Sequence, residues 1–266
     1  MIEIEIGTAP ADMRLRVPAS RDSLPLVRQA LRSLGETVAA EQDALEDAEL
    51  ALTEACANAV EHAYADSEGS IEVVVEPRER DMRVSVRDFG GGFDTSKARD
   101  DDRGFGLALI ESIATDFEVR GGDGTEVAMS FELGSGEVGT VDGAIPGLEP
   151  AERILRRVVA VAGAQIDLRT DRLMESLLVA ELIARHGLRH LIGDKVNITI
   201  DSTEGGLALG IGPLERGGGR AVITESEVPV FGSVVDRLAD SVSVREDSAG
   251  GVDCEHLVLW IEAASG

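Results

Sequence analysis

The chain has 266 residues, 43% of them hydrophobic, which is enough for one or two domains with buried cores. Its net charge of −25, from 50 acidic and 25 basic residues, argues against direct binding of nucleic acid, because phosphate recognition needs a basic face. No run of about eighteen apolar residues and no signal-peptide pattern occurs, so we expect no membrane span and a cytoplasmic location. The two cysteines, Cys56 and Cys254, lie in apolar patterns and are expected to be reduced core thiols.

The first half of the chain alternates between strand-like and helix-like patterns. In order, it predicts a strand, two helices, two strands, a glycine-rich acidic loop, a helix and two strands. These elements are expected at residues 12–17, 23–35, 42–64, 70–77, 81–88, 89–106, 107–115, 116–122 and 125–133.

A stretch rich in glycine and proline, residues 136–150, predicts a linker between domains at 1–135 and 151–266. After it, the order of the first half returns: two helices, two strands, a glycine-rich loop, a helix and two strands. The expected residues are 152–163, 171–187, 195–201, 206–212, 213–220, 229–240, 241–247 and 255–262. The order and the paired segments IATDFEV with LADSVSV and EVAMSF with HLVLWI favour a tandem duplication.

The predicted helix over residues 42–64 carries a polar stripe. Within LTEACANAVEHAY, Glu54, Asn58 and His62 recur every four residues and therefore share one helical face. A carboxylate there can orient and deprotonate a nucleophile, and an amide oxygen suits Mg²⁺. The alternative for this stretch alone is an amphipathic helix with a solvated polar stripe.

Glycine-bearing motifs follow at the junctions between predicted elements. Asp88 ends a strand and begins DFGGGFD, where glycines let the backbone approach a ligand closely. Further on, in RGFGLALIES, Gly104 and Gly106 open a helix whose free N–H groups form a ready anion site. Arg103 stands just before it, where it could meet a terminal phosphate. Thr125 begins a strand, where its hydroxyl could reach a buried polar group.

Together these motifs resemble the ATP-binding domain of the GHKL superfamily, and more closely the bacterial anti-sigma factor serine/threonine-protein kinases. The resemblance is carried by TEACANAVEHAY, RDFGGGFD and DRGFGLALI, and it covers roughly residues 10–135. It implies an α+β fold, a two-layer α/β sandwich with a mixed, mostly antiparallel sheet and helices on one face. The expected cofactors are ATP and Mg²⁺.

The resemblance also implies roles for single residues around the adenine and the metal. Asn58 would bind Mg²⁺, and Glu54 would be the catalytic general base for a protein serine hydroxyl. Asp88 would accept a hydrogen bond from the adenine amino group, supported by Thr125. Room for the nucleotide would come from Gly90 and Gly92. For His62 we expect a structural hydrogen bond rather than catalysis.

The phosphates would lie at the start of the third helix. The residues that the resemblance places around them are Gly104, Phe105, Gly106 and Leu107, with backbone N–H groups donated by the two glycines. Arg103 would approach the γ-phosphate, and residues 94–103 would form an acidic lid over it.

In function, the resemblance implies an ATP-dependent serine protein kinase that is also an anti-sigma factor in a partner-switching system. Its partners would be a sigma factor and an anti-sigma factor antagonist of the STAS type, and it would act as a homodimer or an intramolecular pseudo-dimer. The alternative is a non-catalytic ATP-binding module that works only through its partners. A histidine-kinase catalytic unit is disfavoured, because none of the four histidines sits in a phospho-acceptor helix hairpin.

The second half repeats the pattern without the chemistry, so it predicts a degenerate GHKL-like domain without a nucleotide site. Glu181 aligns with Glu54, but Arg185 falls where Asn58 would be, and the strand end after residue 206 offers no aspartate. Pro229 and Phe231 fall near the places of Gly104 and Gly106. An alternative is an antagonist-like domain, in which Ser202 would be a phosphorylation target.

Overall fold

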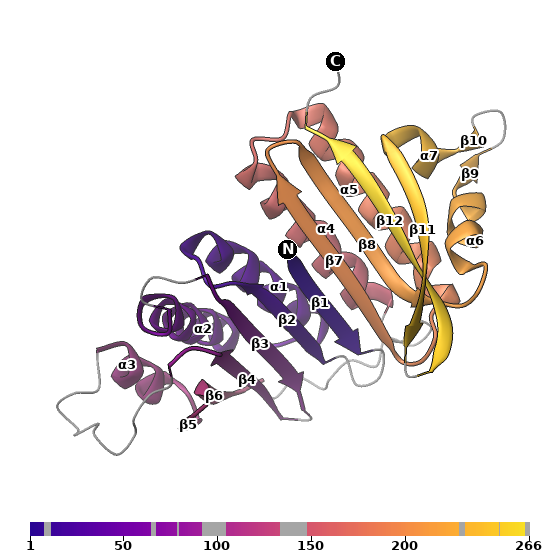
Figure 1. The fold of residues 1–266 in the computed structure, drawn as a ribbon. Helices are drawn as coiled ribbons and strands as arrows, with labels where there is room; N and C mark the ends of the chain where they lie inside the picture. The colour runs from indigo at the N-terminus through magenta and orange to yellow at the C-terminus, as the bar shows by residue number, and fades with distance from the viewer. Residues whose placement is uncertain are drawn as a thin grey trace. The chain divides into compact units, whose positions relative to one another are not determined.

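The computed structural model of the chain divides into two compact units (Figure 1). The first unit is Pro10–Gly143, and the second unit combines Met1–Ala9 with Ala144–Gly266. The described residues are 1–7, 12–64, 68–78, 80–91, 105–133, 148–228, 232–249 and 251–263. Among them, no helix is long and apolar enough to cross a membrane.

The first unit is an antiparallel sheet with strand order β2-β3-β4-β6-β5, and helices pack on one of its faces. Its elements are β2 (Met13–Pro18), the 3₁₀ turn η1 (Arg21–Ser23), α1 (Leu24–Thr37), α2 (Gln42–His62), β3 (Ser70–Pro77), β4 (Asp81–Asp88), α3 (Phe105–Ile113), β5 (Asp116–Gly122) and β6 (Gly124–Glu132). The expected fold class is confirmed, and most expected elements agree within two residues.

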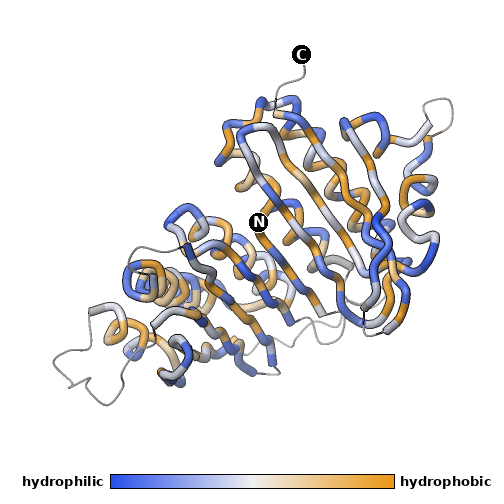
Figure 2. Tube along the Cα trace, in the orientation of Figure 1, coloured by the Kyte–Doolittle hydropathy of each residue, from blue (hydrophilic) through white to orange (hydrophobic). Residues whose placement is uncertain are grey.

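Alternation of apolar and polar residues sets the register of this sheet. Met13, Leu15 and Val17 of β2 are buried against the helices, while the residues between them face solvent. Figure 2 shows this alternation of hydrophobic and hydrophilic residues along the strands. A slip of one residue would expose the whole apolar set, so the pattern fixes which side chains face the helices.

The second unit has a sheet with strand order β11-β12-β8-β7-β1. Its elements are β1 (Ile2–Gly7), α4 (Leu148–Gln165), α5 (Thr170–Gly187), η3 (Leu188–His190), β7 (Lys195–Thr203), β8 (Gly206–Leu214), α6 (Gly218–Glu225), β9 (Glu227–Val228), β10 (Gly232–Ser233), α7 (Val234–Leu238), β11 (Ser241–Ala249) and β12 (Val252–Glu262).

Read from the first strand of each unit, the two sheets have the same topology. β1 stands where β2 stands, and β7, β8, β12 and β11 follow in the order of β3, β4, β6 and β5. Single contacts repeat as well: the Thr115 N–H donates to the Ser130 carbonyl at 2.9 Å, and the Asp240 N–H donates to the Trp260 carbonyl at 2.8 Å. The shared topology supports the duplication and the copy hypothesis for the second half, rather than the antagonist-like alternative.

The helix pair α1 and α2 also matches the pair α4 and α5, with one constant difference in residue number along both helices. A Cβ on Gly35 would lie 2.4 Å from the Leu45 Cδ1, and a Cβ on Gly163 would lie 2.8 Å from the Leu173 Cδ1. Both glycines therefore let the first helix of a pair lie against a leucine of the second. The buried positions from Ala48 to Ala59 in α2 recur at the same offset in α5.

Three sequence expectations for the organisation of the chain need correction. The first strand, β1, was not expected, and it clusters with the second unit rather than with a domain at residues 1–135. Its signal is present in IEIEIG, because Ile2, Ile4 and Ile6 are buried while Glu3 is exposed. The expected linker over 136–150 ends too late, because α4 begins at Leu148.

The third correction concerns the region between β8 and β11. A loop was expected over residues 213–220 and a helix over 229–240, but α6 occupies Gly218–Glu225 and α7 is confined to Val234–Leu238. The glycines of PLERGGGR hid the helix start, since Gly217 adopts φ 88° just before it. Residues 229–231 lie outside the described part.

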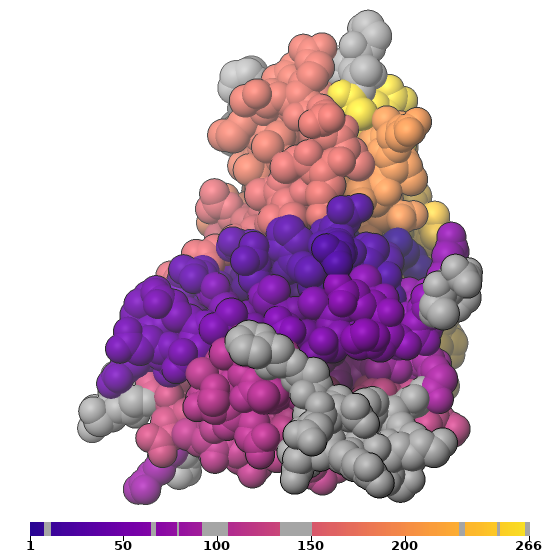
Figure 3. All heavy atoms as spheres, turned by 90° about the vertical axis from the view of Figure 1, so that its left-hand side faces the viewer, coloured from indigo at the N-terminus to yellow at the C-terminus, as the bar shows by residue number. Residues whose placement is uncertain are grey.

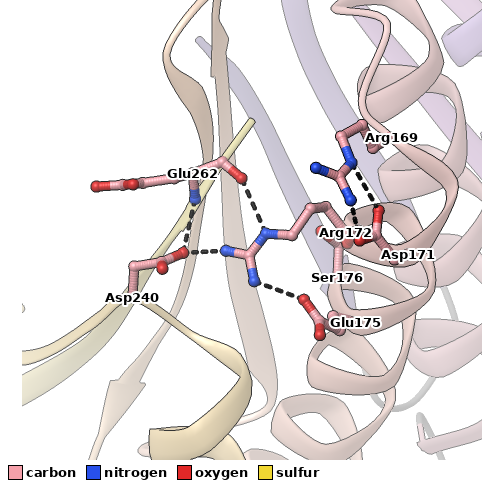
Figure 4. Close-up of polar contacts among 7 residues, drawn as sticks. All are labelled: Arg169, Asp171, Arg172, Glu175, Ser176, Asp240 and Glu262. Atoms are coloured by element: carbon pink, nitrogen blue, oxygen red, sulfur yellow. Dashed lines mark hydrogen bonds and ion pairs between the residues drawn. The ribbon is translucent and has the colours of Figure 1, made fainter. Parts of the chain in front are cut away.

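A buried arginine ties the start of α5 to the last strand of the second unit (Figure 4). Arg172 donates from Nε to the Glu262 carbonyl at 3.0 Å, from one terminal nitrogen to Glu175 at 2.5 Å and from the other to Asp240. The same Asp240 oxygen accepts the Glu262 N–H at 2.8 Å. The side chain of Arg172 is only 9% exposed, so its charge depends on these partners.

We predict that Asp240→Asn lowers the free energy of unfolding of the second unit by about 1–3 kcal/mol, because it removes the charge of one of the two carboxylates that pair with the buried Arg172. Urea denaturation followed by Trp260 fluorescence measures this directly, since Trp260 is the only tryptophan in the chain and lies in β12. Arg169→Gln is the matched control: it removes the exposed Arg169–Asp171 pair and should cost less than about 1 kcal/mol. Equal effects of the two variants would contradict the structural role of the network.

A cluster of imidazoles and carboxylates fastens α6 to the end of α5. Glu225, at the end of α6, lies 3.1 Å from His186 Nδ1 and 2.8 Å from His190 Nε2, and Arg189 lies 3.8 Å from it. The other nitrogen of His190 lies 3.0 Å from Glu215. Both ring nitrogens thus face carboxylates, so the protonated ring satisfies both. Glu215 and Glu225 raise the pKa of His190, and the hydrogen bond from His190 lowers the pKa of Glu225.

The stabilising effect of His190 should therefore depend on pH. A raised folded-state pKa adds stability that is fully present below the ordinary value of 6.5 and is lost as the pH rises through the folded value. We predict that the urea midpoint of the second unit, read from Trp260, rises between about pH 8 and about pH 6, and that His190→Gln shows a smaller rise. Comparing the unmodified chain with His190→Gln removes the general effect of the acidic composition, which both proteins share. If the urea midpoints of the two proteins changed with pH in parallel, the role assigned to His190 would be wrong.

Candidate functional site

Helix α2 carries the polar stripe because its opposite face is made of small apolar residues. Ala51, Ala55 and Ala59 are buried with Cys56, which lets the helix pack closely on β4 and β6. Burial raises the pKa of the Cys56 thiol to about 12, so it stays a protonated core group, and neither cysteine forms a disulfide. Glu54 and Asn58 remain half-buried on the other face.

The carboxylate of Glu54 lies against the start of α3. A Cβ on Gly106 would lie 2.0 Å from Glu54 Oε1, so a larger residue here would displace this carboxylate. Helices α2 and α3 lie next to each other on the face of the first unit in Figure 3. The structure therefore places two of the predicted site residues, from distant parts of the sequence, in direct contact.

One turn along α2 from Glu54 lies the side chain of Asn58. Neither side chain has a hydrogen-bond partner among the described residues, so both are available to a ligand. A carboxylate and an amide oxygen one helical turn apart can act as a proton acceptor and as a hard metal ligand, respectively. This donor set fits Mg²⁺, which prefers oxygen ligands and keeps several waters.

Asp88, at the end of β4, is a buried residue held by hydrogen bonds. It is 4% exposed, and its Oδ1 accepts the N–H groups of Gly90 at 3.0 Å and of Thr125 at 3.2 Å. Thr125 thus contacts Asp88 through its backbone amide and not through the hydroxyl that the sequence suggested. The second oxygen, Oδ2, accepts no hydrogen bond from the described residues, so it can accept one from a ligand amino group.

Two glycines allow the close packing around Asp88. A Cβ on Gly90 would lie 2.1 Å from the carbonyl oxygen of Ala63, just after α2. A Cβ on Gly124, which adopts φ 94°, would lie 2.0 Å from the Asp88 carbonyl oxygen. The Asp88 corner is therefore held between the end of α2 and the start of β6.

Along α2, the Asp88 corner and the Glu54–Gly106 contact are separated by the stretch from Glu54 to Ala63. At a rise of 1.5 Å per residue this is about 13 Å. One end offers a fixed carboxylate oxygen to an amino group, and the other offers polar side chains and the start of a helix. An elongated ligand with an amino-bearing ring and an anionic tail, such as a nucleotide, fits this arrangement.

Some predicted site residues lie outside the described part. These are Gly92, Arg103, Gly104 and the lid over residues 94–103, together with the side chain of Phe105. Leu107 is half-buried on α3, one residue after Gly106. His62 is exposed at the end of α2 and has no hydrogen bond to the described residues, so the expected structural bond is not seen there.

In the second unit, the helix offset corrects the alignment made from sequence. The offset that matches Gly35 with Gly163 places Leu182 and His186, rather than Glu181 and Arg185, where Glu54 and Asn58 stand. Glu181 and Arg185 instead form an ion pair with each other at 2.8 Å. Leucine is neither a base nor a metal ligand, and His186 is already engaged by Glu225.

The other elements of the site are replaced too. The buried face of β8 continues through Leu209 and Ile211 to Pro213, which stands where Asp88 stands on β4. The N–H groups at the start of α6 are taken by the chain itself: Glu255 accepts those of Gly217 at 2.8 Å and Gly219 at 3.1 Å. A carboxylate of β12 thus occupies the N-terminal end of α6, whereas the helix that leads into β11, as α3 leads into β5, is the short α7.

Comparison with known proteins agrees with this geometry. Residues 17–131 match the family of histidine kinase-like ATPase domains. The serine-protein kinase RsbW of Bacillus velezensis is 29% identical over 143 residues, which cover 48% of this chain and 89% of the relative. RsbW of Staphylococcus aureus is 33% identical over 134 residues, covering 44% of this chain and 84% of the relative.

Among solved structures, the histidine kinase domain of the blue-light activated histidine kinase EL346 from Erythrobacter litoralis matches with a TM-score of 0.31 and 21% identity. The match covers 34% of this chain and 45% of that chain, a likeness too low to carry an argument. The relatives and the family match agree with the glycine contacts at Glu54 and Asp88. The chain therefore belongs to the RsbW family of serine-protein kinases, with a histidine kinase-like ATPase domain in its first unit.

Proposed function

We propose that the chain is an ATP-dependent serine protein kinase and anti-sigma factor that phosphorylates an anti-sigma factor antagonist in a partner-switching system. The observation that carries the proposal is the contact of the Glu54 carboxylate with Gly106 at the start of α3, with Asn58 one turn away. This contact supports the proposal because it would bring a proton acceptor and a metal ligand to a helix start that could bind phosphates.

In the proposed reaction, the adenine amino group donates to Asp88 Oδ2, and the phosphates lie before α3. Glu54 removes the proton of the substrate serine as its oxygen attacks the γ-phosphorus. The bond between the γ-phosphorus and its bridging oxygen breaks, ADP leaves, and the serine becomes phosphoserine. Mg²⁺, held through Asn58, would neutralise phosphate charge, which matters in a chain with a net charge of −25.

The second unit would contribute no chemistry of its own. With Leu182, His186 and Pro213 in place of the three polar site residues, we assign one nucleotide site to the chain, in the first unit. The sigma factor and the antagonist would bind as protein partners. A homodimer or an intramolecular pseudo-dimer also stays a prediction.

We predict that Asn58→Ala weakens the binding of Mg²⁺–ATP by about 10- to 100-fold, because the Mg²⁺ ion loses the side-chain oxygen of Asn58 as a ligand. Isothermal titration calorimetry of the full chain measures this. Asn197→Ala is a matched control, since Asn197 is an exposed asparagine on β7. An Asn58→Ala affinity equal to that of the control would contradict the metal-binding role.

For Glu54→Gln we predict normal ATP affinity but a loss of about 10²- to 10⁴-fold in phosphoryl transfer, the contribution of a general base. Transfer from γ-labelled ATP to antagonist proteins of the source organism measures it. The control Glu46→Gln alters an exposed carboxylate of the same helix. ATP binding without transfer in the unmodified chain would favour the alternative, a non-catalytic ATP-binding module.

A further inference from the structure

A tyrosine just beyond α2 holds the backbone next to Asp88. The hydroxyl of Tyr64 donates to the Ser70 carbonyl at 2.7 Å and accepts the N–H of Phe89 at 2.8 Å. Phe89 directly follows Asp88, so this one hydroxyl links the end of α2, the start of β3 and the end of β4. A hydroxyl can donate and accept at once, and both capacities are used here.

The tyrosine ring lies where it does because its neighbour is a glycine. A Cβ on Gly69 would lie 2.2 Å from Cε1 of Tyr64, so any larger residue would displace the ring. The residue before Tyr64, Ala63, makes the close backbone contact with Gly90. The chain segment after α2 therefore contacts both residues that follow Asp88.

The Phe89 ring also contacts two cations. The guanidinium carbons of Arg16 and Arg87 each lie 5.2 Å from its centroid, although the residue is 41% exposed. Phe89 is thereby contacted at its ring by the two guanidinium groups and at its backbone N–H by the Tyr64 hydroxyl. Asp88 Oδ1 accepts the N–H groups of Gly90 and Thr125, and the Phe89 peptide lies in the chain between Asp88 and Gly90, so a shift of that peptide would also move Oδ2.

We propose that Tyr64 is a positioning residue for nucleotide selection: by holding the Phe89 N–H, its hydroxyl aims Asp88 Oδ2 at the 6-amino group of the purine. The inference rests on the proposed function, because it assumes that Asp88 reads the adenine. It goes beyond that function in assigning base selectivity to a residue that does not touch the ligand.

The test compares two ligands that differ only at the atom in question. ATP and purine riboside 5′-triphosphate, which lacks the 6-amino group, are titrated against the unmodified chain and Tyr64→Phe in the presence of Mg²⁺. We expect the unmodified chain to prefer ATP by about tenfold or more, the contribution of a hydrogen bond to a charged group. In Tyr64→Phe this preference should fall by about three- to tenfold, while the affinity for the purine analogue changes little.

Two further variants separate positioning from general destabilisation. Ser33→Ala removes another hydroxyl of the first unit, which donates to the Gln29 carbonyl in α1, and should keep the preference of the unmodified chain. Gly69→Ala keeps the Tyr64 hydroxyl but displaces its ring, and should lower the preference as Tyr64→Phe does. Circular dichroism establishes that each variant is folded, and Gly69→Ala stands in should Tyr64→Phe fail to fold.

The outcomes distinguish the inference from the function beneath it. If the unmodified chain prefers ATP but Tyr64→Phe or Gly69→Ala keeps that preference, or loses affinity equally for both nucleotides, the positioning role is wrong. If the unmodified chain binds neither nucleotide or does not discriminate between them, the assignment of Asp88 fails instead. A reduced preference in both variants, with Ser33→Ala unchanged, supports the inference.

Discussion

The close approach of two glycine backbones to helix α2 is the constraint on which the site depends. Gly106 leaves room for the Glu54 carboxylate, and Gly90 leaves room for the carbonyl of Ala63. A side chain at either position would collide with atoms that the site needs, at distances near 2 Å. The glycines therefore matter here for the space they leave beside the two ends of the candidate site along α2.

The two units show that the scaffold and the chemistry are separable. Sheet order, helix pairing and the glycine–leucine contacts between helices recur in both, so these features serve folding. Glu54, Asn58 and Asp88 have no counterparts in the second unit, where Leu182, His186 and Pro213 stand. In their place the second unit has internal contacts: Glu255 caps α6, and Glu225 fastens it to His186. The same architecture thus carries different polar contacts in its two copies.

The sequence predicted much of this because its local signals agree with the fold. Strands at 70–77 and 81–88 follow a period of two, and the polar stripe of α2 follows a period near four. The strands, the helix and the face of α2 that carries Glu54 could therefore be predicted from the sequence. What failed depended on distant contacts. The strand β1 pairs with β7 nearly 200 residues later (Ile2 with Ile200), so nothing local assigns it to the second unit. The start of α6 was hidden because its glycines are capped by Glu255 from another strand, and the role of Tyr64 depends on a bond to Phe89 across a turn.

Hydrogen exchange of the full chain with and without Mg²⁺–ATP, read by mass spectrometry, tests whether the chain has one nucleotide site in its first unit. We expect added protection in peptides that contain Gly90, Gly106 and Thr125. We expect none in peptides that cover α5 and α6. Protection of α6, or no change around Asp88 at saturating nucleotide, would contradict this expectation.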